Sequence, residues 1–176
     1  MLTLPVFRCV IEDSGYTAVQ VNGYANLTVK SSRISSSYYG IKVSATSEEG
    51  ECLECGPTVP GSSEEILKYV LVNVEDTEVD GGSYGVRCSG RAVDCRITNS
   101  HLQMNLIQAV SCHNVRSCTV QQCTMNSSSS YGLAVDAVNA QMLAIDSNII
   151  IKKTSGQVIS ASSCNFVQVR FRYSFY

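Results

Sequence analysis

Several features that would assign a function directly are missing from this sequence. No apolar run approaches the roughly 18 residues of a membrane-spanning helix, so we expect no membrane span. The opening residues, MLTLPVFRCV, have neither the basic segment nor the long apolar segment of a secretory signal. The chain also has no phosphate-binding glycine loop, no Ser-His-Asp order and no basic-aromatic stripe. We therefore expect no cofactor and no nucleic-acid partner.

Histidine is scarce, whereas cysteine is plentiful, with two histidines and nine cysteines in the chain. Cys52-x-x-Cys55 has the spacing of half a zinc site or of a redox pair, but no second pair and no His-x-x-x-His accompanies it. A metal site, a loop disulfide and two ordinary cysteines remain open there, and we assign no metal. Because an odd number of cysteines in a chain of this size does not suggest a disulfide framework, we expect mostly buried, reduced thiols in a reducing compartment.

Charge is divided unevenly along the chain. The 176 residues carry a formal net charge of −2, and 16% of them are charged. Ten acidic residues and one lysine lie between Ser47 and Asp80, whereas eight basic and three acidic residues follow from Gly81 onward. An acidic middle and a basic end fit either a solvated surface or contacts between copies of the chain. The length and the 44% hydrophobic content indicate one domain, 1–176.

Two short patterns repeat together along the chain. In the first, a small residue precedes an apolar residue, any residue and a small apolar residue. In the second, two apolar residues stand two apart before a small or polar residue and a further apolar one. Most copies begin 22 to 26 residues apart. The first pattern occupies 18–21, 40–43, 85–88, 109–112, 132–135 and 158–161, and the second occupies 27–34, 72–79, 95–102, 118–125, 143–150 and 169–176.

The spacing within both patterns predicts β-strands. Apolar residues two apart place their side chains on one face of a strand, and each run ends at Gly, Asn, Ser or Asp, which favour turns. Short strands with one apolar face cannot form a core within a single repeat. Stacked repeats can, so the sequence predicts a solenoid in which equivalent residues form ladders.

The second pattern is fullest in LAIDSNII, residues 143–150. This Leu-x-Ile-x-x-Asn-x-Ile arrangement resembles the Val-x-Ile-x-x-Asn-x-Ile signature of the right-handed parallel β-helix of the pectate-lyase-like superfold. That superfold includes polysaccharide lyases, glycoside hydrolases and viral tailspikes. The resemblance covers the chain from about Val6 to Tyr176 and implies an all-β, single-stranded parallel β-helix of roughly six to seven coils. The family's asparagine lies at a tight turn, and its equivalents here are Ser32, Thr77, Ser100, Cys123 and Asn148.

One interval between repeats is longer than the others. Gly40 and Gly85 begin successive copies of the first pattern but lie 45 residues apart. The interval contains residues 46–66, the only segment rich in Gly, Pro, Ser and Glu together. We interpret this segment as an acidic loop inserted into one coil, because loops of such length in compact domains are usually functional or disordered.

Tyrosine precedes the glycine of the first pattern three times, at Tyr39, Tyr84 and Tyr131. Packing at a corner of the coil explains these residues, and the small residue after each one permits a sharp entry from the preceding turn. The alternative is an aromatic stripe that stacks on sugar rings. Against it, we expect the three tyrosines to lie on non-adjacent coils.

Four cysteines occupy repeated positions. Cys88 and Cys112 match in the first pattern, and Cys95 and Cys118 match in the second. Neighbouring coils lie about 4.8 Å apart, which is within disulfide reach, but ladder neighbours rarely meet the dihedral requirement of a disulfide. We expect stacks of inert, buried thiols.

Catalysis in the pectate-lyase-like superfold implies two or three carboxylates on the outer face of one sheet. The best candidates are Glu75, Asp76, Glu78 and Asp80, at a turn and a strand. Glu78 and Asp80 are two apart and can share a face, but we expect no carboxylates on the adjacent coils to complete a site. Ordinary solvated turn acids explain the same residues.

The last segment, NFVQVRFRYSFY, alternates basic and apolar residues and indicates an interface as much as a terminus. Its candidate interface residues are Arg170, Phe171, Arg172, Tyr173, Phe175 and Tyr176. We expect a structural or receptor-binding virion component, such as a phage tailspike-like or surface-decoration protein. We expect this protein to form a homotrimer, to contact other virion subunits and to bind a surface glycan. We expect it on a virion or cell surface after assembly from the cytoplasm. The alternatives are a polysaccharide hydrolase or lyase and a carbohydrate-binding adhesin without turnover.

Overall fold

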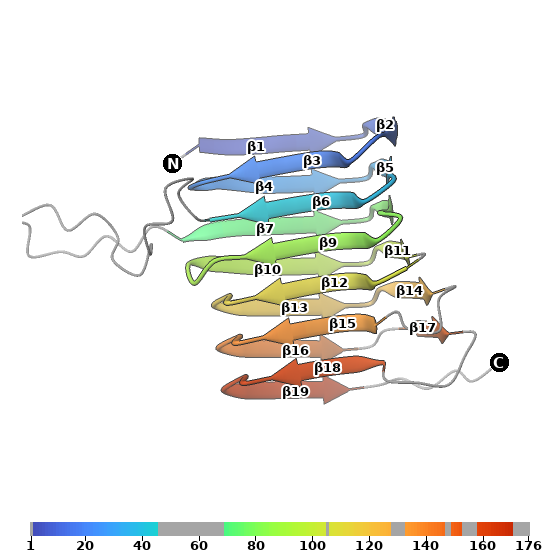
Figure 1. Cartoon of the computed structure of the whole chain (residues 1–176). Coiled ribbons are helices and arrows are strands. Elements are labelled where there is room, and N and C mark those ends of the chain that lie inside the picture. The colour runs from blue at the N-terminus through green and yellow to red at the C-terminus, as the bar shows by residue number, and fades with distance from the viewer. Residues whose placement is uncertain are drawn as a thin grey trace, which may run out of the picture.

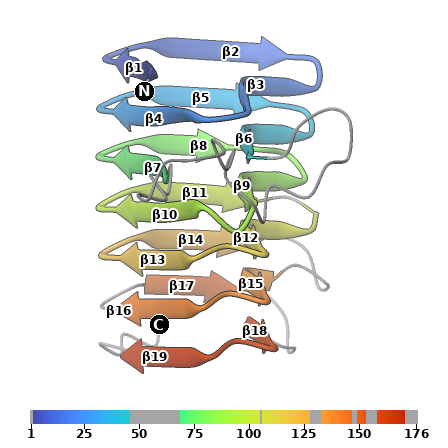
Figure 2. The ribbon, with the colours of Figure 1, turned by 90° about the vertical axis from the view of Figure 1, so that its left-hand side faces the viewer.

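A computed structural model of the chain describes residues 2–45, 69–104, 106–127, 133–146, 149–152 and 158–170. Within these ranges the regular secondary structure consists of β-strands alone, and every strand pairing is parallel. The strands stack one above another as a β-solenoid (Figures 1 and 2). The all-β parallel solenoid expected from the repeats is therefore confirmed.

The strands form three sheets, which the chain visits in the same order on each coil. Sheet A contains β1 (Leu2–Phe7), β4 (Ala25–Lys30), β7 (Val70–Glu75), β10 (Val93–Thr98), β13 (Ser117–Gln121), β16 (Met142–Asp146) and β19 (Phe166–Arg170). Sheet B contains β2 (Val10–Ser14), β5 (Arg33–Ser36), β8 (Glu78–Asp80), β11 (His101–Met104), β14 (Thr124–Ser127) and β17 (Ile149–Lys152). Sheet C contains β3 (Thr17–Asn22), β6 (Tyr39–Ser44), β9 (Tyr84–Ser89), β12 (Gln108–His113), β15 (Leu133–Val138) and β18 (Ile159–Ser162).

The interior of the solenoid consists of apolar ladders, one for each inward position of a strand. The first apolar position of the second pattern lies in sheet A, and its last position lies in sheet B. The first pattern supplies sheet C. Each fully buried aliphatic side chain contributes about 1.5 to 3 kcal/mol relative to an exposed one. Examples of these ladders are Leu27, Val72, Cys95, Cys118 and Leu143 in sheet A, and Ile34, Val79, Leu102 and Met125 in sheet B.

Tight turns with one left-handed residue join the sheets. Ser100 follows such a residue, Asn99, between β10 and β11. Its hydroxyl donates a hydrogen bond to the carbonyl of Thr98 at 2.8 Å and accepts one from the amide of Thr77 at 3.2 Å. The small polar residues Ser32 and Ser100, at equivalent turn positions, therefore bond from coil to coil. The left-handed residues after sheet A strands are Arg8, Ser31, Asp76, Asn99 and Gln122, and those after sheet C strands are Gly23, Gly90, Asn114, Asn139 and Ser163.

The long interval between repeats does not interrupt the stacking. Strand β4 pairs with β7, and β6 pairs with β9, so the strands on the two sides of the interval are direct neighbours. The predicted acidic loop, 46–66, lies outside the described residues. Among the residues that are described, no helix is long and apolar enough to cross a membrane.

Candidate functional site

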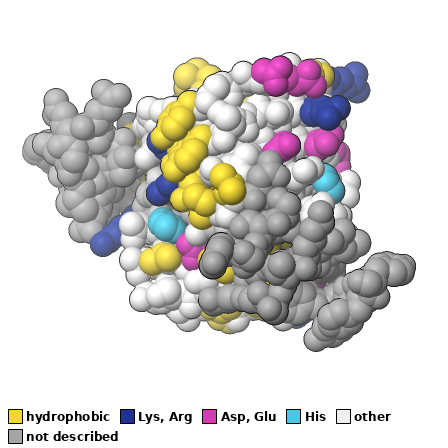
Figure 3. All heavy atoms as spheres, turned by 45° about the vertical axis from the view of Figure 1, so that its right-hand side comes forward, with side chains coloured by type: hydrophobic (Ala, Val, Ile, Leu, Met, Phe, Trp, Pro, Cys, Tyr) yellow, Lys and Arg dark blue, Asp and Glu magenta, His cyan; other side chains and the backbone are white. Residues whose placement is uncertain are grey.

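The outer face of sheet C carries a group of polar and aromatic side chains. Figure 3 looks toward the edge between sheets B and C, where hydrophobic side chains form a contiguous patch beside basic ones. One outward ladder crosses all six strands of sheet C, and its charged members change from basic to acidic along the solenoid. Its members are Gln20, Lys42, Arg87, Ser111, Asp136 and Ser160.

Four tyrosines form one cluster at the turn from sheet B to sheet C, and we call this cluster the tyrosine platform. The rings of Tyr16 and Tyr38 are stacked, with centroids 5.0 Å apart, and those of Tyr39 and Tyr84 are also stacked at 5.0 Å. Tyr38 and Tyr39 join the two stacks edge to face at 4.6 Å. Tyr16 is 59% exposed and Tyr39 only 6%. Tyr39 therefore packs beneath the platform, and Tyr16 is its solvent-exposed member.

The expectation that these tyrosines lie on non-adjacent coils is wrong for two of them. Tyr39 and Tyr84 are direct partners in the register of β6 and β9. Their separation in sequence comes from the inserted segment, which adds no described strand between the two. Tyr131 lies outside the described residues. The objection to an aromatic stripe therefore does not hold for Tyr39 and Tyr84.

Two cations accompany the platform. Arg87 Nη1 donates a hydrogen bond to Tyr39 Oη at 2.9 Å, and its guanidinium lies 5.3 Å from the ring centroid of Tyr84. Lys42 Nζ lies 5.0 Å from the ring centroid of Tyr39. Burial raises the pKa of the Tyr84 hydroxyl, with a further contribution from Tyr38, so this hydroxyl remains neutral at physiological pH. The face combines aromatic rings with fixed positive charge.

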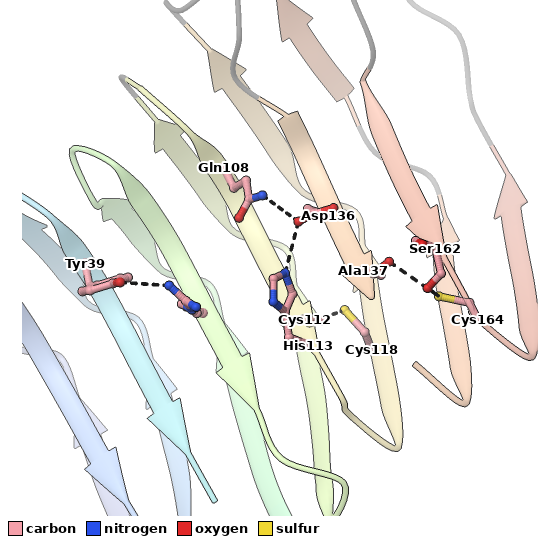
Figure 4. Close-up of polar contacts among 10 residues, drawn as sticks. Tyr39, Gln108, Cys112, His113, Cys118, Asp136, Ala137, Ser162 and Cys164 are labelled. Carbon is pink, nitrogen blue, oxygen red and sulfur yellow. Dashed lines mark hydrogen bonds and ion pairs between the residues drawn. The ribbon is translucent and has the colours of Figure 1, made fainter. Parts of the chain in front are cut away.

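Further along sheet C, a buried carboxylate organises a second polar group (Figure 4). Asp136 is 8% exposed, and its Oδ2 accepts a hydrogen bond from Gln108 Nε2 at 2.7 Å and lies 3.1 Å from His113 Nε2. Ser111 stands beside Asp136 in the register of β12 and β15. Its hydroxyl is buried and has no hydrogen-bond partner among the described residues. No sequence motif indicates this group, because its members come from two strands, β12 and β15.

The four acidic candidates separate into two places. Glu78 and Asp80 lie on β8, on either side of the buried Val79, and both line a hollow of about 210 Å³ on the outer face of sheet B. Glu75 accepts a hydrogen bond from Lys30 Nζ at 3.0 Å, and Asp76 accepts one from Asn99 Nδ2 at 2.5 Å. Glu75 and Asp76 therefore belong to ion-pair and turn interactions outside the hollow.

The hollow contains carboxylates that the sequence did not associate with Glu78 and Asp80. Glu12 and Asp13, on β2, line it as well, although β5 lies between β2 and β8. Arg33 Nε on β5 is 3.6 Å from Glu78 Oε2 and 4.0 Å from Glu12 Oε1. The side chains of Arg33 and Glu78 are 61% and 48% exposed. A glycosidase general acid usually lies in a water-poor, apolar setting, which this hollow does not provide.

The remaining sequence candidates are only partly covered by the structure. Cys52 and Cys55 lie outside the described residues, and so do Phe171, Arg172, Tyr173, Phe175 and Tyr176 of the candidate interface. Arg170 ends β19, is exposed, and pairs in register with Asp146. In the part of the chain that the structure describes, no group of three or more His, Cys, Asp or Glu residues could hold a metal ion.

Comparison with known proteins adds no relative. No family model, no curated protein and no solved structure matches this chain. The structure establishes a parallel β-solenoid, whereas the likeness to the pectate-lyase-like superfold depends on the residue pattern of 143–150.

Proposed function

We propose that this protein is a non-catalytic, glycan-binding surface component, and that an acidic glycan binds on the tyrosine platform. The proposal depends on one observation: Tyr16, Tyr38, Tyr39 and Tyr84 from neighbouring coils form a single aromatic cluster. Tyr16 is its exposed member, and Arg87 lies beside it. A β-solenoid of the pectate-lyase-like type, on a virion or cell surface, is the setting in which we place this activity. The role that we propose is that of a phage tailspike-like or surface-decoration protein.

The chemistry of the platform favours a sugar with a carboxylate. Aromatic faces carry partial negative charge, so they attract the partly positive C–H groups of a sugar ring. Arginine recognises carboxylates through paired hydrogen bonds, and Arg87 and Lys42 lie on the same outward ladder. A uronic-acid oligosaccharide meets both requirements. The half-exposed acids of the sheet B hollow would repel the same ligand.

Calorimetric titration with acidic and neutral oligosaccharides tests this proposal. Wild-type protein is expected to bind a uronic-acid oligosaccharide, and Tyr16→Ala is expected to weaken binding about fivefold to tenfold, the effect of one aromatic contact. The matched control is Tyr69→Ala, which removes an exposed tyrosine on the side of sheet A. Equal affinities for the wild type and Tyr16→Ala would rule out the platform.

A hydrolase or lyase is the second candidate, because four carboxylates line one hollow on sheet B. Inverting glycosidases use two carboxyl groups on opposite sides of the scissile bond, and the hollow has carboxylates on both β2 and β8. If the hollow is catalytic, Glu78→Gln and Asp80→Asn abolish depolymerisation without changing the melting temperature. Depolymerisation that survives both substitutions removes these residues from any mechanism.

We also propose that copies of the chain assemble as a homotrimer through the C-terminal segment that includes Arg170. The proposal is supported by exposed apolar side chains on β19, namely Phe166, Val167 and Val169. Light scattering behind a sizing column, under reducing conditions, measures the mass directly. A trimer near three times 19.0 kDa is expected, and a monomer at micromolar concentration contradicts it.

A further inference from the structure

Four cysteines form a single cluster in the core of the solenoid. Cys88 and Cys112 are neighbours in sheet C, and Cys95 and Cys118 are neighbours in sheet A. Each of the four is at most 1% exposed. Nothing in the proposed glycan-binding role uses them, so their arrangement needs a separate explanation.

The closest sulfur atoms belong to different sheets. Cys88 Sγ lies 3.0 Å from Cys95 Sγ, and Cys112 Sγ lies 2.7 Å from Cys118 Sγ. Figure 4 shows the second pair, which faces across the turn between β12 and β13. Both distances are less than about 1 Å longer than the 2.05 Å of a disulfide bond. The repeats align Cys88 with Cys112 and Cys95 with Cys118, whereas the closest sulfur atoms lie across a turn.

Cysteine occurs at both inward positions on the two sides of a turn from sheet C to sheet A, or at neither. The inward residue of a sheet C strand and its partner across the turn in sheet A recur along the whole solenoid. Of the six such pairs among the described strands, two have cysteine at both positions and four have it at neither. Those four pairs are Val21 with Leu27, Val43 with Val72, Ala137 with Leu143, and Ala161 with Val167. Cysteines that merely filled space would not need to occur in pairs.

We propose that Cys88 with Cys95, and Cys112 with Cys118, are two dithiol pairs that form disulfides joining sheet C to sheet A. In each pair a thiolate attacks a low-molecular-weight disulfide and forms a mixed disulfide, releasing one small thiolate. The second cysteine then attacks the first cysteine's sulfur and releases the other. Each pair loses two electrons and two protons, and the small disulfide becomes two thiols. The exchange takes place before the coils close during folding, or when the turn opens.

The cluster favours a thiolate at one position. Hydrogen bonds with the thiols of Cys112, Cys118 and Cys88 lower the pKa of Cys95. Hydrogen bonds with Cys118, Cys88 and Cys95, together with burial, raise the pKa of Cys112. In the closed cluster, a thiolate is therefore favoured at Cys95 over Cys112.

A non-reducing tryptic map of the full chain tests the pairing, because arginines separate the four cysteines. Protein refolded in a glutathione redox buffer is alkylated, digested and examined by mass spectrometry. The expected products are the peptide 88–91 linked to 92–96, and the peptide 97–116 linked to 117–152. Each link lowers the mass by two hydrogen atoms, about 2 Da. Cys123→Ser removes the second cysteine of the peptide 117–152 and places there the residue found at position 100.

Two variants separate pairing from packing. Cys88→Val and Cys112→Ala each introduce a residue found at the same ladder position, Val43 and Ala137 respectively. Each variant is expected to lose only its own linkage. Oxidation is expected to raise the wild-type melting temperature by about 5 °C or more. The double variant, Cys88→Val with Cys112→Ala, is expected to show no such rise.

Three results would overturn the proposal. The first is four alkylated cysteines in protein refolded in the glutathione buffer. The second is linkage between ladder neighbours, Cys88 with Cys112 and Cys95 with Cys118. The third is a stoichiometric zinc or copper ion retained by the purified protein and lost in the double variant, because the thiols would then be metal ligands.

Discussion

The ring of Tyr39 stacks on the ring of Tyr84, with centroids 5.0 Å apart and planes at 23°. The two residues begin β6 and β9, which are neighbours in sheet C even though the inserted segment separates them in sequence. A solenoid determines which residues meet by their register, and insertions at its turns leave that register unchanged. The platform therefore exists because the coils before and after the insertion stack directly.

The inserted segment is expected to be dispensable for folding. Ala45 donates a hydrogen bond from its amide to Ser89, and Val70 pairs with Val93. The short turn that joins Ser89 to Val93 therefore spans the equivalent distance on the next coil. Replacing 46–68 with a short glycine-rich turn is expected to change the melting temperature by no more than about 3 °C. Loss of the β-sheet signal in circular dichroism would show instead that the segment supports the fold.

Gly40→Ala is expected to destabilise the solenoid strongly. A Cβ atom at Gly40 would lie 2.4 Å from Val79 Cγ1 and 2.7 Å from the carbonyl oxygen of Gly85. Such overpacking costs about 1 to 3 kcal/mol, which lowers the melting temperature by about 3 to 10 °C. Gly15→Ala is the matched control, since a Cβ atom there meets nothing within 4 Å. Equal thermal denaturation curves for the two variants would contradict the packing described for this corner.

The hydroxyl of Ser100 is expected to stabilise the turn between sheets A and B. Ser100→Ala leaves the amide of Thr77 without its hydrogen-bond acceptor in a buried position. An unsatisfied buried amide costs about 1 to 3 kcal/mol. Thr119→Ala, on the outer face of β13, provides a control that removes a hydroxyl without affecting this contact. Urea denaturation should give a lower midpoint for Ser100→Ala than for the wild type or Thr119→Ala. Equal midpoints for the two variants would show that the Ser100 hydroxyl does not stabilise the turn.

Alternation and repeat spacing were enough to predict the strands, the solenoid and its inward ladders, because a buried face leaves a regular trace in the sequence. The outward faces leave no such trace. Glu12 and Asp13 share a hollow with Glu78 only because β2, β5 and β8 stack. The contact of Cys88 with Cys95 crosses a turn whose path the repeats do not specify. Contacts between outward side chains of different coils, and between inward side chains on the two sides of a turn, therefore follow from the three-dimensional stacking and not from the repeat pattern.

Arg87 is expected to make glycan binding dependent on salt. Arg87→Gln removes the cation beside Tyr39 and Tyr84, so affinity for a uronic-acid ligand falls and the remaining binding responds less to ionic strength. The matched control is Arg96→Gln, an exposed arginine on the outer face of sheet A. Titrations at low and high salt check both variants. An unchanged salt dependence in Arg87→Gln would place the ligand elsewhere.

The most direct measurement records both glycan retention and the release of reducing ends in the same sample of each protein. The proteins are the wild type, Tyr16→Ala, and the double variant Glu78→Gln with Asp80→Asn. The account predicts that wild-type protein retains an acidic glycan and produces no new reducing ends. Retention should fall in Tyr16→Ala and persist in the double variant. New reducing ends that vanish in the double variant would contradict the account and assign the protein to the polysaccharide-cleaving enzymes.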